Sequence, residues 1–423
     1  MLPRPPTIQL HNGDLVECLP FGQACRCNVH HFNQLASLVR NCHAYLPFLT
    51  LSTLFSVKNA AKYETALNRL FHVSFSTGSN HRLYADVEVQ IKRLQEITRQ
   101  LSAVAAIKSK FLECTRRHAN PMTSDSQALI VLGNLRILLD CVHNKRTSLE
   151  EDWWSFLDQH PRKTEEMLRV LMDDTRNRSD QLWDHIPHMT FHDFSTLGVG
   201  RWLNDEIINC FVKKWCTQAR TTLGLSTFFA CKFLFEDNSC VTAKSGVLTA
   251  QEGARILRSC RKTERDLGFV PSSWDSVFIP IHENTSHWYS AFIDFRYKRI
   301  QIYDSLRETC VINRQKPICL RKNTNLMLVL MWLTEILGQM RGDTVCLSNN
   351  PETDWVFDPH SKVHFQPNAF DCGVHMLWHL QHVLEFRQVR VGQECEVDRL
   401  NFTDNMAGKR MRLALELLRD SEP

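Results

Sequence analysis

Apolar residues recur at steps of three and four along the stretch 86–117, as they do on one face of a helix. The apolar positions of this stripe are Val87, Ile91, Leu94, Ile97, Leu101, Val104 and Phe111. Lys108 interrupts the stripe near its end. The pattern is typical of a helical hairpin or a short coiled coil, and it also fits a helix packed within its own domain.

The stretch before residue 180 is expected to be mainly helical. Further helices are predicted at 124–142, 147–159 and 163–174. The polar run 176–180 then interrupts the pattern and marks a candidate boundary. We therefore expect two domains, a mainly helical region at 1–180 and a second domain at 181–423.

The second half mixes strands and helices. Runs rich in β-branched and aromatic residues predict strands at 276–282, 288–295 and 299–304, with a shorter one within 355–365. The two runs on either side of residues 295–298 are joined tightly enough to form a hairpin. Helices are predicted at 203–215, 323–340 and 372–386. Strands framed by helices indicate an α+β domain.

Composition sets broad limits on function. The 423 residues include 43% hydrophobic and 23% charged residues, which is ordinary for a globular protein, and the length favours two domains. A formal net charge of +4 with both signs interspersed predicts no nucleic-acid partner, and the basic clusters at 116–117 and 258–265 fit solvated faces. No apolar run of signal-peptide type follows the N-terminus, and the apolar run 326–337 is too short to cross a membrane. We expect a protein of the nucleus or cytoplasm, with no membrane partner.

Sixteen cysteines without an export signal are expected to be thiols, since disulfides are rare in reducing compartments. The segment that comes nearest to a metal site contains Cys25, Cys27, His30, His31, Cys42 and His43. Its first pair is separated by one residue, whereas zinc sites use two to four. A Cys- and His-rich turn region explains the cluster as well, so we predict no metal and no cofactor.

Cys372 has the features of a nucleophile. It lies where the turn 366–371 meets the apolar helix 372–386, and the start of a helix favours the negative charge of a thiolate. Gly373 would let the backbone approach a reacting carbonyl closely. Gln366 supplies a side-chain amide that could donate to an oxyanion.

A base for this thiol is available on the predicted hairpin. His287 lies at the start of one strand and Asp304 at the end of the next, so the two are expected to meet as hydrogen-bond neighbours. The chemistry alone leaves competitors open, namely His282 and His364 for the histidine and Cys310 and Cys319 for the cysteine. It also leaves open a purely structural role, with a small buried cysteine at a helix start and a histidine at a strand end.

The order His287-Trp288, then 303–306 (Tyr-Asp-Ser-Leu), then 366–373 (Gln-x-Asn-x-x-Asp-Cys-Gly) resembles the catalytic domain of the ubiquitin-like-protein-specific proteases, the SUMO (sentrin) protease family. The upstream block 201–209, which contains Trp-Leu-Asn-Asp before an apolar helix, strengthens the likeness. The resemblance covers roughly 185–390 and implies a papain-like cysteine protease fold with a mixed sheet packed by helices.

The resemblance implies a role for each matched residue. Cys372 would be the nucleophile, His287 the general base and acid, Asp304 its orienting partner and Gln366 the oxyanion donor. The substrate-binding residues would be Trp202 and Trp288, which resemble a roof over a Gly-Gly tail, and Asp205, which resembles the acidic contact for the modifier.

The partner implied by the resemblance is SUMO or another ubiquitin-like protein and its conjugates, and the reaction is hydrolysis after the Gly-Gly tail in deSUMOylation or precursor processing. The stretch 305–365 is long for the family, and His375 and His379 stand where the family is usually more apolar, so the preferred modifier stays open. The same fold could also act on ubiquitin or another ubiquitin-like protein, transfer the acyl group to another acceptor, or belong to a mobile-element-associated protease. A non-enzymatic scaffold that only binds the modifier is a further possibility, and the helices before residue 180 could bind another protein.

Overall fold

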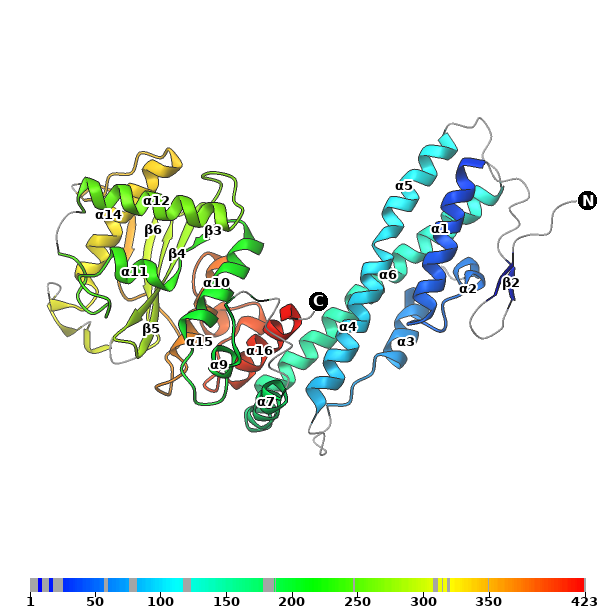
Figure 1. Cartoon of the computed structure of the whole chain (residues 1–423), viewed down its shortest axis with the longest axis horizontal. Helices are drawn as coiled ribbons and strands as arrows, with labels where there is room; N and C mark the ends of the chain where they lie inside the picture. The colour runs from blue at the N-terminus through cyan, green and yellow to red at the C-terminus, as the bar shows by residue number, and fades with distance from the viewer. Residues whose placement is uncertain are drawn as a thin grey trace, which may run out of the picture. The chain divides into compact units, whose positions relative to one another are not determined.

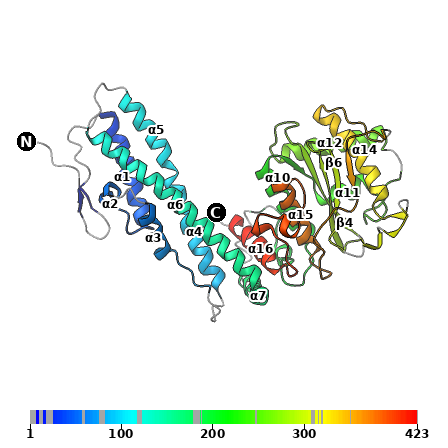
Figure 2. The same cartoon turned by 180° about the vertical axis from the view of Figure 1, so that it is seen from behind.

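The computed structural model describes residues 7–9, 15–17, 26–56, 60–75, 82–116, 123–177, 186, 188–245, 248–306, 311–313, 315–317, 320–348 and 350–421 (Figures 1 and 2). The chain divides into two compact units, Met1–Phe156 and Leu157–Pro423. This division lies earlier than the boundary expected near residue 180, because α7 (Pro161–Arg176) packs against α16 (Ala407–Ser421) at the end of the chain. Helix α7 is thereby part of the second unit.

The first unit is mainly helical. Its short antiparallel sheet pairs β1 (Thr7–Gln9) with β2 (Leu15–Glu17). The helices are α1 (Arg26–His43), α2 (Leu51–Ser56), α3 (Ala60–Leu70), α4 (Leu83–Leu101), α5 (Ala103–Arg116) and α6 (Thr123–Gln159), the last of which runs past the division. Helix α1 packs against both α4 and α5 (Figure 1).

The apolar stripe predicted within 86–117 runs across α4 and α5. The two helices meet at Ser102, which keeps helical angles (φ −58°, ψ −27°), so the apolar face continues across the junction. Every predicted member of the stripe is buried, which confirms it as a packing face. The two helices predicted at 124–142 and 147–159 are in fact one, α6, since the intervening residues 143–146 contain neither Gly nor Pro to end it.

The second unit is built on a five-stranded mixed sheet in the order β3-β4-β5-β6-β7. The strands are β3 (Thr222–Gly224), β4 (Ser276–Glu283), β5 (His287–Asp294), β6 (Arg299–Tyr303) and β7 (Val356–Asp358). The pairs β4/β5 and β5/β6 are antiparallel, whereas the edge pairs β3/β4 and β6/β7 are parallel. Sheet and helices together confirm the α+β class predicted for this half.

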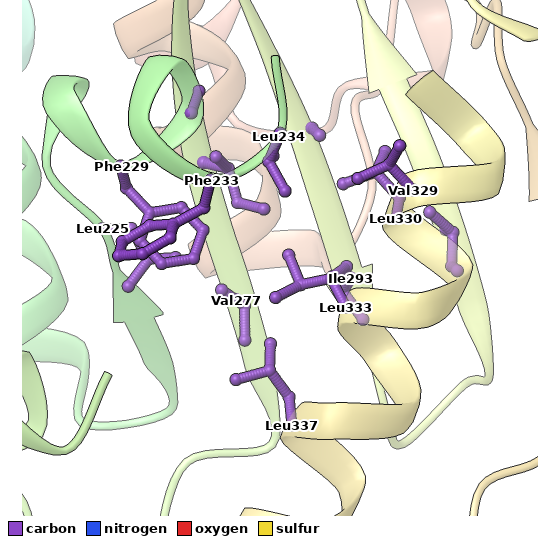
Figure 3. Close-up of a cluster of buried hydrophobic side chains, with 14 of the residues drawn as sticks. Leu225, Phe229, Phe233, Leu234, Val277, Ile293, Val329, Leu330, Leu333 and Leu337 are labelled. Carbon is purple, nitrogen blue, oxygen red and sulfur yellow. The ribbon is translucent and has the colours of Figure 1, made fainter. Parts of the chain in front are cut away.

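Helices cover both faces of this sheet (Figures 1 and 2). One face carries α11 (Thr227–Phe233), α12 (Ala250–Asp266) and α14 (Thr324–Arg341). Alternate strand residues such as Val277 and Ile293 meet Phe233 and Leu333 there in a continuous apolar core (Figure 3). On the other face α15 (Cys372–Phe386) packs against β5, with α10 (Asp205–Ala219) beside it. The central strands are thus buried on both sides, which explains their near-continuous apolar sequences.

The predicted strands at 276–282, 288–295 and 299–304 coincide with β4, β5 and β6 to within one residue. Strand β3 escaped prediction because three residues carry no readable alternation, and its partner Ser276 lies 54 positions beyond Thr222. The apolar run 326–337 lies within α14 and packs on the sheet. In the part of the chain that the structure describes, no helix has both the length and the apolar character needed to cross a membrane.

Candidate active site

Cys372 is the first residue of α15 and is buried. The helix has the bounds predicted for it, 372–386, so the thiol lies at the end of the helix where unpaired backbone N–H groups and the positive end of the helix dipole favour negative charge. The glycine that follows also has a packing role. A Cβ on Gly373 would lie 3.0 Å from Cβ of Leu203, so the glycine lets α15 begin directly against the segment that precedes α10.

His287 and Asp304 meet at one end of the β5/β6 hairpin. The register pairs Ser290 with Tyr303, which brings the start of β5 beside the residue that follows β6. His287 Nε2 lies 2.8 Å from Asp304 Oδ1, so the hydrogen bond expected between the two side chains is present. Both side chains are buried, and the backbone N–H of Leu306 also donates to Asp304 Oδ1. The carboxylate therefore fixes the orientation of the imidazole ring.

The third group at this position is the Cys372 thiol. Burial of the His287 ring lowers its pKa, but hydrogen bonds to Asp304 and Cys372, together with the electrostatic attraction of both, outweigh burial and raise the pKa to about 9. Because Nε2 faces Asp304, Nδ1 is the ring nitrogen left to face the thiol. An imidazole that stays protonated at neutral pH stabilises a neighbouring thiolate and can also supply a proton.

Gln366 is held by hydrogen bonds on both ends of its amide. Its Oε1 accepts from the hydroxyl of Ser305 at 2.6 Å, and its backbone N–H donates to the Ser305 carbonyl at 3.0 Å. Its Nε2 donates to the Asn368 carbonyl at 2.6 Å. An amide nitrogen carries two hydrogens, so the arrangement orients the group while leaving one N–H for a further acceptor.

The two tryptophans lie in very different surroundings. Trp202 is 53% exposed, and its indole N–H donates to the Ala369 carbonyl, three residues before Cys372, at 2.7 Å. Trp288 is 1% exposed, and its indole N–H donates to the Leu203 carbonyl at 2.9 Å. Each indole thus links a segment of the site to another that is distant in sequence, and that of Trp202 contacts the turn that leads to Cys372.

Asp205 begins α10, directly after Asn204, whose side chain caps the helix by accepting from the Ile207 N–H. Its carboxylate lies 3.6 Å from Nδ1 of His282. The His282 ring in turn stacks on Trp288, with centroids 3.8 Å apart and planes within 5°. His282, which competed with His287 on chemistry alone, therefore joins Trp288 and Asp205 instead.

The remaining competitors for the catalytic histidine and cysteine are separate from this group or lie outside the described residues. His364 lies 3.4 Å from Asp404 and stacks on Phe402. Cys310 and Cys319 lie outside the described residues, as does Cys25 of the possible zinc cluster. Among the residues that the structure does describe, no group of three or more His, Cys, Asp or Glu side chains is arranged to hold a metal ion.

The sequence did not predict the residues that hold the site residues in place through hydrogen bonds. Ser305 orients Gln366 and directly follows Asp304, so its position beside a predicted site residue was the only available signal. Arg410 forms an ion pair with Asp371, the residue before Cys372, from α16 at the end of the chain. Nothing in the spacing of these residues indicates that contact.

Comparison with known proteins gives a family match over the same segment. Residues 201–417 match the sequence model described as the Ulp1 protease family, C-terminal catalytic domain. Ubiquitin-like-specific protease 1 of Saccharomyces cerevisiae is 27% identical over 188 residues, 44% of this chain and 24% of that protein. A sentrin-specific protease of Caenorhabditis elegans is 30% identical over 114 residues, 27% of this chain and 14% of that protein. Ubiquitin-like-specific protease ESD4 of Arabidopsis thaliana is 26% identical over 181 residues, 42% of this chain and 31% of that protein. The match thus spans less than a third of the length of each of these relatives.

Solved structures of similar proteins were also found. A structure of the SUMO protease Ulp1 with its catalytic cysteine oxidised to a sulfinic acid aligns with 61% of this chain and 95% of that chain, at 21% identity and a TM-score of 0.42. The C-terminal Ulp1 protease domain in complex with Smt3, the yeast orthologue of SUMO, aligns with 58% of this chain and 95% of that chain, at 22% identity and a TM-score of 0.38.

Proposed function

Since the chain belongs to the Ulp1 protease family, whose C-terminal catalytic domain its residues 201–417 match, we propose that it is a cysteine peptidase acting on SUMO or a related ubiquitin-like modifier. The bond cleaved is the peptide or isopeptide bond that follows the modifier's Gly-Gly tail. The observation that carries the proposal is the buried hydrogen bond between His287 and Asp304 with the Cys372 thiol as the third member of the group. A thiol, an imidazole and a carboxylate in hydrogen-bond sequence are the parts that nucleophilic acyl transfer requires.

The reaction follows from these groups. The Cys372 thiolate attacks the carbonyl carbon of the terminal glycine, and the carbonyl electrons move onto oxygen. Protonated His287 gives its proton to the leaving amine as the C–N bond breaks, which leaves a thioester. Neutral His287 then takes one proton from water, whose oxygen attacks the thioester carbonyl. The thiolate is released together with the glycine carboxylic acid, which gives its remaining proton to solvent. Asp304 keeps the ring oriented through both steps.

Gln366 is proposed to donate a hydrogen bond to the oxyanion that forms during the reaction. Its amide is held by Ser305 and Asn368 with one N–H left over, and the first backbone N–H groups of α15 add further donors. A donor fixed in advance stabilises the developing charge without reorganisation during the reaction.

Trp202 and Trp288 are proposed to form the walls of the passage that binds the Gly-Gly tail. Asp205 is proposed to bind a basic residue of the modifier. The tail has no side chains, so a narrow aromatic passage accepts it and excludes larger residues. The indole hydrogen bonds to Ala369 and Leu203 support this assignment, because they hold both rings against segments that adjoin Cys372. The half-exposed carboxylate of Asp205 at the start of α10 is accessible to a partner.

The protease domain is proposed to occupy residues 181–423, and the helices before it to bind another protein. We place the activity in the nucleus or cytoplasm, where a catalytic thiol remains reduced. Fluorescence imaging of the tagged chain, with helices α1 to α5 present and deleted, tests the location and whether those helices determine it; α7 is kept because it packs against α16.

The deciding experiment is covalent capture. The full chain is incubated with SUMO, ubiquitin and one further ubiquitin-like protein, each carrying a cysteine-reactive group at its C-terminus. We expect an adduct of one-to-one mass with SUMO, absent in Cys372→Ala. Cys346→Ala is the matched control, because Cys346 is an exposed thiol in the same unit, and its adduct should form at the wild-type rate.

Capture of a different modifier would overturn the substrate, and an adduct that survives in Cys372→Ala would overturn the nucleophile. If none of the probes reacts, the chain is not a peptidase of these modifiers, and the non-enzymatic scaffold becomes the better explanation provided that SUMO still binds.

A further inference from the structure

A buried arginine lies behind the candidate active site. Arg410 belongs to α16 and is 2% exposed. All five of its N–H groups have acceptors, because Nε donates to a carboxylate and each terminal nitrogen donates to two backbone carbonyls. A guanidinium so completely bonded is costly to move, since each lost bond would leave a buried donor or acceptor without a partner.

One set of bonds holds the segment that leads to Trp202. Nη1 of Arg410 donates to the carbonyls of Thr196 at 3.2 Å and Gly198 at 3.1 Å. Nη2 donates to the carbonyl of Arg201, the residue just before Trp202, at 2.7 Å. The segment 196–201 has no regular secondary structure beyond its turns, so these bonds substitute for a helix or sheet ladder.

The other set holds the segment that leads to Cys372. Nε of Arg410 donates to Asp371 Oδ1 at 2.8 Å, and Nη2 lies 2.8 Å from the same oxygen. Nη2 also donates to the Phe370 carbonyl at 3.0 Å. The second oxygen of Asp371 accepts from the side-chain amide of Asn368 at 2.8 Å, so the whole turn before the nucleophile is tied to one cation.

The two segments also touch each other directly. The indole of Trp202 donates to the Ala369 carbonyl, and Gly373 lies against Leu203. The Trp202 contact lies nearer the surface, since Trp202 is half exposed, whereas Leu203, Gly373 and Arg410 are all buried. The spacing between Trp202 and Cys372 is therefore set by a contact near the surface and by contacts in the interior.

We propose that Arg410 is a positioning residue that sets the spacing between the segment bearing Trp202 and the segment bearing Cys372. This inference rests on the proposed function, in which Trp202 forms a wall beside the Gly-Gly tail and Cys372 attacks the carbonyl at its end. A fork of five donors can bind four carbonyls and a carboxylate at once, whereas the ammonium of lysine has three donors and cannot. Charge alone is not sufficient for the role.

The test is Arg410→Lys in the full chain, which keeps the charge beside Asp371 but removes the fork. Arg412→Lys is the matched control, being the same change two positions further along α16 at a guanidinium that lies over the Trp378 ring. Peptide-resolved hydrogen exchange should show at least about tenfold faster exchange in both 196–204 and 366–371, because bonds to a charged donor are lost in both. Exchange in α14, on the far face of the sheet, should stay unchanged.

Two kinetic measurements distinguish a changed spacing between the Trp202 and Cys372 segments from a general loss of structure. Cleavage of a SUMO fusion should lose about 100-fold in kcat/KM, mostly in kcat, as expected when a substrate is misplaced by about 1 Å. Alkylation of Cys372 by iodoacetamide should stay within about threefold of wild type, because the thiol and His287 are held together by α15 and β5, which Arg410 does not contact in its hydrogen bonds. Arg412→Lys should leave both rates at the wild-type value.

The inference is overturned if exchange rises in neither segment or in only one, or if alkylation falls as far as cleavage. If Arg410→Lys does not fold, Asp371→Asn takes its place. Hydrogen exchange should then be faster in 366–371 while 196–201 stays protected. An unchanged exchange rate in 366–371 would refute the positioning role of Arg410. If the wild type cleaves no modifier, the proposed function fails, and the exchange pattern alone supports or overturns the role of Arg410 in spacing the segments.

Discussion

Acid is expected to destabilise the second unit through a buried histidine near Cys372. His375 lies in α15, three residues after Cys372, and is completely buried. Its ring lies beside those of His364 and Phe402, at centroid distances of 5.8 and 5.6 Å, and neither ring nitrogen has a hydrogen-bond partner among the described residues. Burial, and to a smaller extent the charges of His364 and Arg410, lower the pKa of His375 to about 3.

The size of the effect follows from the difference between the folded and unfolded pKa values. A histidine in an unfolded chain has a pKa of about 6.5. Because the folded value is lower, the stability contributed by neutral His375 is complete above pH 6.5 and is lost as the pH falls from 6.5 towards 3. Between pH 7.5 and pH 4.5 the free energy of unfolding should fall by about 2–3 kcal/mol from this residue alone. The pKa values of His379 and His382 are lowered by burial as well, so they add to the loss.

The assay compares wild type with His375→Phe, which keeps a flat ring against Phe402 but cannot be protonated. Urea unfolding is followed at both pH values by tryptophan fluorescence, which reports mainly on residues 157–423 because only Trp153 and Trp154 lie before them. The variant should lose about 2–3 kcal/mol less than wild type. His192→Phe, at an exposed histidine of the same unit, should behave as wild type. Equal losses in wild type and His375→Phe would refute the reasoning.

Three further changes test the site and its supports. Asp304→Asn should lower kcat/KM for a SUMO fusion by roughly 10²- to 10⁴-fold, because the ring loses its orienting carboxylate; a variant with near-normal rates and an unchanged circular dichroism spectrum would contradict this. Gly373→Ala should cost about 1–3 kcal/mol of unfolding free energy by urea denaturation, since the new methyl meets Cβ of Leu203 at 3.0 Å and neither atom can rotate away; an unchanged urea midpoint would show that the helix shifts freely. Ser305→Ala should lower kcat by about 10-fold, because the side-chain amide of Gln366 is then held less firmly. Removing that amide in Gln366→Ala should lower kcat by roughly 10²- to 10³-fold. Equal losses in Ser305→Ala and Gln366→Ala would show that Ser305 does more than orient the amide.

Elements with a strong local pattern could be predicted closely from the sequence. Helix α15 begins and ends where its apolar run does, and the hairpin of β5 and β6 has the predicted short connection. The hydrogen bond between His287 and Asp304 could be expected because it depends only on that hairpin. Errors arose where local signals were weak: α6 runs through a polar stretch with no residue that ends a helix, and β3 is too short to alternate.

The sequence by itself thus determined the class of fold, the helix start that carries Cys372 and the likeness to a protease family, because each can be recognised from short stretches of neighbouring residues and from their order along the chain. Only the tertiary structure decided which groups hold that site in place. Arg410 binds carbonyls up to 214 positions away, and Trp202 binds a carbonyl 167 positions away. Such contacts involve backbone oxygens, which every residue carries, so no residue type or spacing in the sequence predicts them.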